Sequence, residues 1–288
     1  RDAQESRGLG DVYKRQTVHE RDGIVPVPSL WAGIGRLHHL ACDSTEPLTI
    51  AVIGAGGKTT CIYALAKELT RCHKKVLIVT TTHMYEPHAD IFAGMDERRV
   101  EALWETVGIA VAGRPCDNGK IGYVGDDVYA RLKRKAHVVL VEADGARRLP
   151  IKVCGPKEPV LPDSCQAILA VAGLSALGKP LEDVCFRSDE AEALGVASAS
   201  SWKRDGRDDK NLVDMDLFAR LFQRGVIEKV APFSIPIIPV FNQADTVARR
   251  IAADVMFQDL GLWGLSTSFL SKAVSYTHLR AHETPEHL

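Results

Sequence analysis

The sequence has 288 residues, of which 45% are hydrophobic and 25% are charged, and its formal net charge is -1. This composition is typical of a globular chain with one sizeable core or two small ones. Because there is no excess of basic residues to neutralise a phosphate backbone, we expect no nucleic-acid partner.

The seven cysteines are an odd number and include no C-x-x-C pair. This pattern argues against a disulfide framework or a zinc knuckle and favours a reducing compartment. No apolar run has the length needed to cross a bilayer, and no signal sequence opens the chain. We therefore expect a cytoplasmic protein with no membrane partner.

The two ends of the chain can be translated from the two strands of one sequencing adapter. Residues 6–16 and 274–284 back-translate into strings that are reverse complements of each other. We predict that residues 1–16 and 274–288 are non-native tails that pack against nothing. Residues 17–47 would be a lead-in segment, with a short helix around Leu30, Trp31 and Ile34, and residues 48–273 would form one α/β domain.

Four short apolar runs predict the strands of this domain, at residues 49–53, 76–79, 138–141 and 168–172. Their apolarity is continuous and not alternating, which is typical of parallel strands that are covered on both faces. Helical patterns separate them. Alternating strands and helices predict a doubly wound, mostly parallel sheet with helices on both faces, as in P-loop NTPases.

The intervening helices have recognisable apolar faces and caps. Ile62, Leu65 and Leu69 share one face after the first strand. Asp96 is a candidate cap for a helix around residues 97–107, and Asp126 or Asp127 for a third helix.

The last third of the domain is predicted less regularly. Residues 201–209 have the composition of an exposed loop. A helix follows around residues 217–222, which Gly225 would terminate. Residues 235–241 form the last predicted strand, in which Pro236 and Pro239 favour a strand start or a sheet edge.

The segment from Gly54 to Thr60 (GAGGKTT) follows the first strand and opens a helix, as a phosphate-binding loop does. Glycines allow a tight curl that aims backbone N–H groups inward, and the helix dipole favours an anion at the same point. Lys58 would bind β- and γ-phosphates, and Thr59 would offer its hydroxyl to Mg²⁺. The predicted nucleotide-binding residues here are Gly54, Gly56, Gly57, Lys58, Thr59 and Thr60. Val52 stands where the long form of the motif has glycine, so this is the short G-x-x-G-K-T form.

Two carboxylates, Glu142 and Asp144, follow the third strand, where a Walker B element would hold magnesium. In an open α/β sheet, ligands bind beyond the carboxyl ends of the strands. We predict Lys58, Glu142 and Asp144 as catalytic residues and Thr59 with Asp144 as magnesium ligands. The sequence does not decide which carboxylate holds the metal and which orients the attacking water.

Further polar residues follow the same strands. Thr80, Thr81 and His83 are candidates for sensing the γ-phosphate or binding a second substrate, although threonines also suit a plain strand. A basic group, Arg147, Arg148 and Lys152, could bind an anionic substrate or be a solvated loop.

The residues Asn242-Gln243-Ala244-Asp245 resemble the N-K-x-D base-recognition motif of GTPases, with glutamine in place of lysine. On that basis Asn242 and Asp245 are predicted to contact the base. The motif favours GTP slightly, and the predicted cofactor is Mg²⁺ with GTP or ATP.

Four motifs in order resemble the YqeC family, across about residues 48–260. They are the Gly54–Thr60 loop and the segments TTTHM (80–84), VEADGA (141–146) and AGLSALGKPL (172–181). The resemblance implies a role in selenium cofactor biosynthesis, as an accessory factor for selenium-dependent molybdenum hydroxylases. Phe186 stands after Cys185 where the family has histidine, so no role of that histidine carries over.

The resemblance and the loop together predict a nucleotide-binding accessory protein that hydrolyses Mg-NTP, with a selenium-dependent hydroxylase or another cofactor-maturation protein as partner. Two alternatives stay open. One is a nucleotide-dependent docking switch without significant turnover, and the other is a ligase or small-molecule kinase with the short loop.

Overall fold

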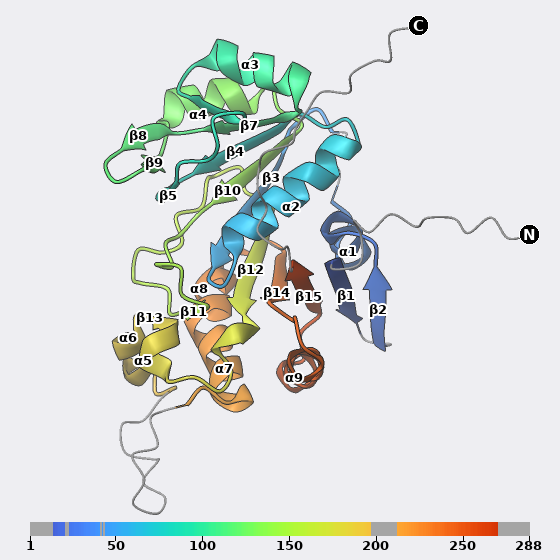
Figure 1. Cartoon of the computed structure of the whole chain (residues 1–288), viewed down its shortest axis with the longest axis vertical. Coiled ribbons are helices and arrows are strands. Elements are labelled where there is room, and N and C mark those ends of the chain that lie inside the picture. Colours follow the sequence, from blue (N-terminus) through green and yellow to red (C-terminus); the bar gives the residue numbers. More distant parts are fainter. Residues whose placement is uncertain (1–13, 21–22, 41, 43, 197–211, 270–288) are drawn as a thin grey trace, which may run out of the picture.

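The computed structural model describes residues 14–20, 23–40, 42, 44–196 and 212–269. A ten-stranded sheet with β6 and β2 at its edges runs through the described structure, and in Figure 1 its labelled strands pass from β7 near one end to β1 and β2 at the other. Its strands, in spatial order, are β2 (Gly23–Val27), β1 (Lys14–Glu20), β15 (Gly264–Phe269), β14 (Ile237–Asn242), β12 (Ala167–Gly173), β3 (Leu48–Gly54), β10 (Val138–Glu142), β4 (Val76–Thr80), β7 (Ile109–Ala112) and β6 (Phe92–Gly94).

The strands from β15 to β6 pair in parallel, and β1 and β2 extend the sheet antiparallel beside β15. The four predicted strands correspond to β3, β4, β10 and β12, so the α/β class and the mostly parallel sheet are confirmed. In the register, Glu142 lies opposite Val52 of β3 and Thr80 of β4. The carboxyl ends of these three central strands therefore meet at one edge.

Helices cover both faces of the sheet. They are α1 (Leu30–Leu37), α2 (Lys58–Arg71), α3 (Glu97–Thr106), α4 (Asp126–Lys133), α5 (Leu181–Val184), α6 (Ser188–Ala193), α7 (Met215–Phe222), α8 (Glu228–Val230) and α9 (Val247–Leu260), with η1 (Leu174–Ala176), η2 (Gln223–Ile227) and η3 (Ala231–Phe233). Two small sheets complete the described structure, one of β5 (His83–Tyr85), β9 (Lys120–Gly122) and β8 (Arg114–Cys116), the other of β11 (Ile151–Lys152) and β13 (Cys185–Phe186).

Alternate residues of β3 explain why its apolarity is continuous. Ile50 and Val52 pack into the core beneath α1 and α2, whereas Ala51 and Ile53 pack into the core beneath α3, α4, α7 and α9. Side chains of a strand point to opposite faces in turn, so a strand between two cores must be apolar throughout. Within the described residues, no helix has the length and apolarity to span a membrane.

The predicted helix in the lead-in segment is α1, in which Leu30 and Ile34 are buried. Ile62, Leu65 and Leu69 are buried in α2, and Asp96 caps α3 by accepting from the backbone amides of Arg98 and Arg99. The cap of α4 is instead Gly125, so Asp126 and Asp127 lie in its first turn. Acidic residues are favourable at either place because the helix dipole is positive there.

Gly225 does not terminate the helix that begins at Met215. The chain continues through a π-helical stretch, Gln223–Ile227, into α8. An added Cβ at Gly225 would lie 3.4 Å from the Lys152 carbonyl oxygen and the Val153 Cα, which is ordinary van der Waals contact, so the helix packs directly on the β11 segment at this point. The predicted loop at 201–209 lies outside the described residues.

The strand predicted as the last one is β14, which lies inside the sheet between β12 and β15 and not at an edge. Pro239 is tolerated because β15 pairs with β14 only at Val240 and Phe241, after the proline. The final strand, β15, was missed because its Leu-Ser-Thr-Ser sequence is rich in hydroxyl groups, yet Ser266, Thr267 and Ser268 are buried.

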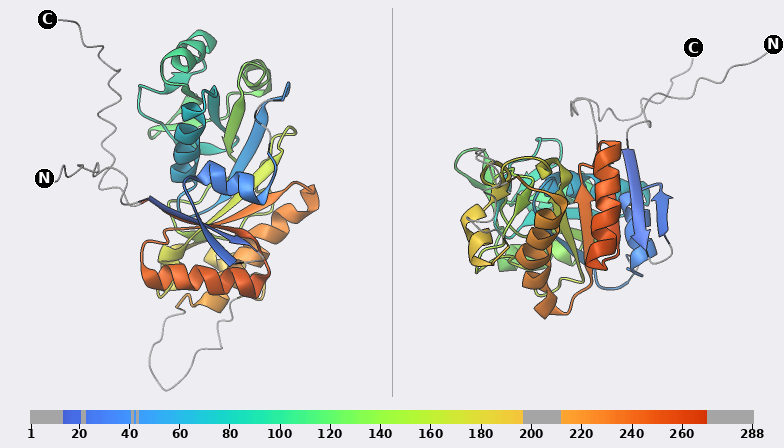
Figure 2. Two further views of the ribbon diagram at one scale, coloured as in Figure 1. Left: turned by 90° about the vertical axis from the view of Figure 1, so that its right-hand side faces the viewer. Right: turned by 90° about the horizontal axis from the view of Figure 1, so that it is seen from below.

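The prediction of an unpacked tail over residues 1–16 is wrong for residues 14–16. They form the start of β1, in register with Phe269, Ser268 and Thr267 of β15. Backbone pairing extends a strand without regard to side-chain identity, which explains the continuation. The origin of the tails stays a prediction, and residues 1–13 and 274–288 lie outside the described part. Segments from the two ends of the sequence, β1 and α9, lie close together (Figure 2).

Candidate functional site

The Gly54–Thr60 loop joins the central strand β3 to α2, and three of its glycines have positive φ values, 90° at Gly54, 75° at Gly56 and 118° at Gly57. Side chains would also collide with neighbouring backbone. A Cβ at Gly54 would lie 2.1 Å from the Val171 carbonyl oxygen, and one at Gly56 would lie 2.3 Å from the Gly173 nitrogen. These positions therefore require glycine for conformation and for space.

The first amides of the loop are already used within the protein. The N–H of Gly54 donates to Asp144 at 2.8 Å, that of Ala55 to the Val171 carbonyl at 2.8 Å, and that of Gly56 to the Leu149 carbonyl at 3.1 Å. The first N–H groups of a helix have no intrahelical partner, so the amides of this motif that are left for a ligand are those of the first turn of α2, which begins at Lys58.

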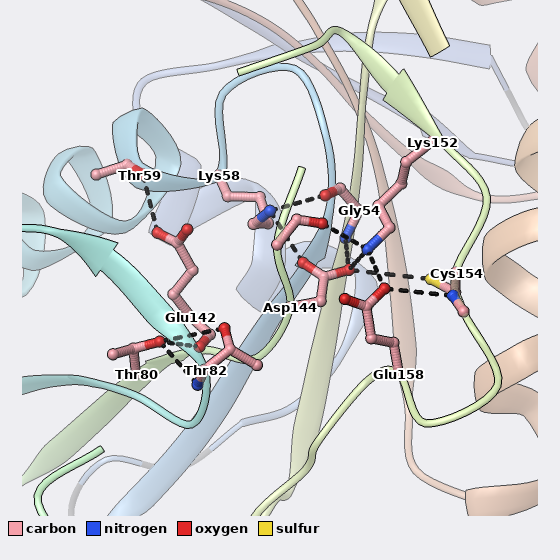
Figure 3. A network of polar contacts seen from close by, with 12 residues as sticks. Gly54, Lys58, Thr59, Thr80, Thr82, Glu142, Asp144, Lys152, Cys154 and Glu158 are labelled. Atoms are coloured by element: carbon pink, nitrogen blue, oxygen red, sulfur yellow. Dashed lines mark hydrogen bonds and ion pairs between the residues drawn. The ribbon is translucent and has the colours of Figure 1, made fainter. Parts of the chain in front are cut away.

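Lys58 lies folded under the loop and not out toward solvent (Figure 3). Its Nζ donates to the Gly54 carbonyl at 2.8 Å and pairs with Asp144 Oδ1 at 2.9 Å, and the side chain is only 4% exposed. The Asp144 side chain is fully buried and also pairs with Lys152, whose Nζ lies 3.0 Å from Oδ2. One carboxylate thus contacts two buried ammonium groups, and such pairing is how a protein makes buried charge tolerable.

Glu142 is bound to a different group, the Thr59 hydroxyl. Thr59 Oγ1 donates to Glu142 Oε2 at 2.8 Å, and Thr80 Oγ1 donates to the Glu142 carbonyl at 2.9 Å. Burial raises the pKa of the Glu142 carboxyl, an effect that the Lys58 charge and the Thr59 hydrogen bond partly offset. The hydrogen bonds therefore join Thr59 to Glu142, and Asp144, which was predicted with Thr59 as a magnesium ligand, has other partners.

Lys152 is at the centre of a second buried cluster that the sequence did not suggest. Its Nζ donates to Glu158 Oε2 at 2.6 Å and to the Gly145 carbonyl at 2.7 Å, besides Asp144. Arg187 Nη1 also lies 2.6 Å from Glu158 Oε2. Burial alone would raise the pKa of Glu158, but the hydrogen bonds from Lys152 and Arg187 lower it to about 2. Because Lys152 is buried, it is not part of a solvated loop.

Asp144, Cys154 and Glu158 place a sulfur and carboxylate oxygens within 4.8 Å of one another. The ammonium of Lys152 already bonds to both carboxylates, so it supplies the positive charge in this cluster. Burial raises the pKa of the Cys154 thiol to about 12. A thiol that is hard to deprotonate is a poor metal ligand and nucleophile.

A cavity of about 520 Å³ opens beside the loop. Its lining includes residues of the loop, the strand-end carboxylate and several distant segments, namely Gly56, Gly57, Lys58, Thr59, Thr60, Thr82, His83, Tyr85, Lys120, Glu142, Arg147, Arg148, Phe186 and Gln243. The predicted residues His83, Arg147 and Arg148 are thus brought to the loop. The hydroxyls of the other two predicted residues are bonded within the protein. Thr80 Oγ1 donates to the Glu142 carbonyl, and Thr81 Oγ1 donates to the Val160 carbonyl at 2.7 Å.

Asn242 and Asp245 are outside the described cavity wall, and both have partners within the chain. Asn242 Nδ2 donates to the Gly56 carbonyl at 2.8 Å, and its Oδ1 accepts from Thr267 Oγ1 at 2.9 Å. Asp245 accepts from Ser268 Oγ at 2.7 Å. Asn242 therefore braces the loop, a role that the sequence could not indicate because Thr267 belongs to the unpredicted strand β15.

Comparison with known proteins matches the part of the chain that carries this site. A family model described as YqeC protein matches residues 50–189, which include the loop, Glu142, Asp144, Lys152 and Glu158. A protein of Escherichia coli (strain K12) named "Uncharacterized protein YqeC" is 34% identical over 159 residues, which are 52% of this chain. The chain spans 62% of the length of that curated relative. This matched segment of the chain is therefore similar to the YqeC family.

Proposed function

We propose that the chain is a P-loop NTPase-like protein that binds a magnesium nucleoside triphosphate at the Gly54–Thr60 loop. The observation that supports this best is the hydrogen bond of 2.8 Å between Thr59 Oγ1 and Glu142 Oε2, at the wall of the cavity. It joins the hydroxyl of a G-K-T motif to the carboxylate that ends the neighbouring strand. These are the two groups that hold magnesium in P-loop proteins.

The donor set fits magnesium, because a hydroxyl and a carboxylate are hard oxygen ligands. Thr59 and Glu142 would hold the ion, with Glu142 in place of the expected Asp144. A bound magnesium ion would neutralise phosphate charge. The first turn of α2 would bind phosphate oxygens through its N–H groups and its dipole. Lys58 would approach the phosphate oxygens by giving up its contact with Asp144. Asp144 would then keep Lys152 as its counterion.

Similarity to the YqeC family leads to the wider proposal, an accessory role in selenium cofactor biosynthesis for selenium-dependent molybdenum hydroxylases. In that role the chain would couple nucleotide binding, and hydrolysis, to maturation of a partner hydroxylase. The cationic side chains that share the cavity with the loop support a second candidate function. This is phosphoryl transfer to a small-molecule acceptor, as in a ligase or kinase.

Phosphate release by the full chain with Mg²⁺ and GTP or ATP tests the catalytic part. We expect release by the wild type and a large loss in Lys58→Met and Thr59→Val, since both remove groups that contact phosphate or metal. Lys157→Met, at an exposed site outside the cavity lining, is the matched control. Equal rates for wild type and Lys58→Met would exclude the NTPase proposal.

Two further measurements separate the alternatives. Tight nucleotide binding without phosphate release in any buffer would identify a docking switch. Phosphate release only when an acceptor is added would identify a ligase, and formation of nucleoside diphosphate with the phosphoryl group on the acceptor would identify a kinase. Binding of labelled GTP and of labelled ATP to wild type and Asp245→Ala tests which nucleotide base is recognised. Loss of a GTP preference in the variant would support guanine recognition by Asp245.

A further inference from the structure

Part of the cavity wall comes from segments that do not belong to the phosphate loop. Tyr85 lies on β5, Lys120 on β9, Phe186 on β13, and Arg147 and Arg148 in the turn after β10. Four separate segments therefore bring two aromatic rings and three cationic side chains to the cavity that the loop opens into.

The cations of this wall rest on the aromatic rings. The guanidinium carbon of Arg148 lies 4.0 Å from the Tyr85 ring centroid, and Lys120 Nζ lies 5.5 Å from the same centroid. The guanidinium carbon of Arg147 lies 5.0 Å from the centroid of Phe186. An aromatic face holds and orients a cation by its quadrupole, but it does not neutralise the charge.

Carboxylates compensate the other cations of the region but not these three. Lys58 and Lys152 pair with Asp144, and Arg187 pairs with Glu158. In the part of the chain that the structure describes, no carboxylate lies within ion-pair distance of Lys120, Arg147 or Arg148. Arg147 and Arg148 are exposed to the cavity, so their N–H groups are available to a ligand.

The backbone of the arginine turn is in an unfavourable conformation. Arg147 and Arg148 have φ values of 46° and 64°, in the left-handed region that favours glycine or asparagine. The turn is held there by hydrogen bonds from the Leu149 N–H to the Ala146 carbonyl at 2.9 Å and from the Gly56 N–H to the Leu149 carbonyl at 3.1 Å. Such backbone outliers concentrate at ligand sites, and this one is bonded directly to the phosphate loop.

We propose that Lys120, Arg147 and Arg148 form a second anion subsite, which binds a phosphate or carboxylate group of a small-molecule substrate while the loop holds the nucleotide. The proposal rests on the proposed nucleotide function for the identity of the first ligand. The planar guanidinium group of arginine can donate two parallel hydrogen bonds to two oxygens of either anion. Loading the nucleotide first leaves these side chains as the binding groups for an added anion.

The test is isothermal titration calorimetry of inorganic phosphate, and in a second series succinate, into the full chain saturated with Mg²⁺ and a non-hydrolysable GTP or ATP analogue. We expect one anion to bind per chain and Arg148→Gln to weaken it by about tenfold or more. Arg148→Lys should recover part of the affinity because it keeps the charge. Arg134→Gln, an exposed arginine at the end of α4, is the control. The series that binds more tightly identifies the preferred anion.

Two outcomes would overturn the subsite. One is the absence of binding of either anion to the wild type. The other is competition between phosphate and the nucleotide analogue, together with weaker analogue binding by Arg148→Gln, which would show that the arginines hold the nucleotide's own phosphates.

Failure of the nucleotide proposal is recognised separately, in nucleotide-free protein. If the analogue does not bind, phosphate is titrated into Lys58→Met with and without Arg148→Gln. Binding that survives the first substitution and is lost with the second would sustain the anion subsite alone. Binding that is unchanged by Arg148→Gln would exclude it.

Discussion

Lys58 and Asp144 form a buried ion pair, with 2.9 Å between Nζ and Oδ1, beneath the loop that would bind phosphate. Glu142, only two residues before Asp144, contacts the Thr59 hydroxyl instead. The two carboxylates at the end of β10 are therefore distinct in their partners. Asp144 stabilises the loop from within, and Glu142 faces the cavity, so substitutions at the two sites should have different effects.

Asp144→Asn should lower the free energy of unfolding by roughly 3 kcal/mol or more, because it removes the negative charge that balances the buried ammonium groups of Lys58 and Lys152. Urea denaturation with linear extrapolation measures this. Glu182→Gln, at an exposed acidic residue, should change stability by less than about 0.5 kcal/mol. An Asp144→Asn variant as stable as the control would contradict a structural role for the pair.

Glu142→Gln should keep the fold and lose the magnesium dependence of nucleotide binding, since an amide can still accept from Thr59 but carries no charge. Calorimetry with and without Mg²⁺ measures the loss. In the wild type, burial raises the Glu142 pKa, and the protonated form cannot hold a metal. Magnesium-dependent binding should thus weaken, as the pH falls, at a higher pH than for an ordinary glutamate. If nucleotide binding by Glu142→Gln still depended fully on Mg²⁺, the metal ligand would be Asp144 and not Glu142.

Asn242→Ala should weaken GTP and ATP binding to the same extent, because Asn242 braces the loop through the Gly56 carbonyl. It also leaves the Thr267 hydroxyl without its acceptor, which should lower stability by about 1–3 kcal/mol. Fluorescent nucleotide titration and thermal melting measure the two effects. A selective loss of GTP binding would instead assign Asn242 to the base.

His19 should make the protein less stable in mild acid. Its ring stacks on Phe257, with 4.5 Å between centroids, and lies between the Ser266 hydroxyl and Asp254. Burial lowers its pKa from 6.5 to about 4. Between these values the unfolded chain takes up a proton and the folded chain does not, so stability falls as the pH falls.

The decrease in the free energy of unfolding that is due to His19 should approach roughly 3 kcal/mol at pH 4. Denaturant unfolding at several pH values, in wild type and His19→Gln, isolates this contribution, since the other titrating groups are common to both. A stability curve of equal slope in the variant would contradict a buried neutral imidazole.

Some of the structure followed from local sequence alone. The apolar runs of β3, β4, β10 and β12 predicted buried parallel strands, because a strand between two cores has no polar face. The glycines and Lys58 predicted a tight strand-to-helix loop, and Asp96 predicted a cap, because turns and caps depend on neighbouring residues only.

Other features depended on partners that are distant in sequence. Nothing local to Lys152 shows that Asp144 and Glu158 enclose it, or that Thr267 holds Asn242 against the loop. The polar strand β15 was invisible to a pattern of apolar residues because its buried hydroxyls are satisfied by Asn242, Asp245 and His19. Sequence by itself determined the central parallel strands, the loop and the family resemblance. Only the tertiary structure decided which carboxylate meets Thr59 and which cations remain unpaired, since burial and charge compensation arise between segments that meet only in the folded chain.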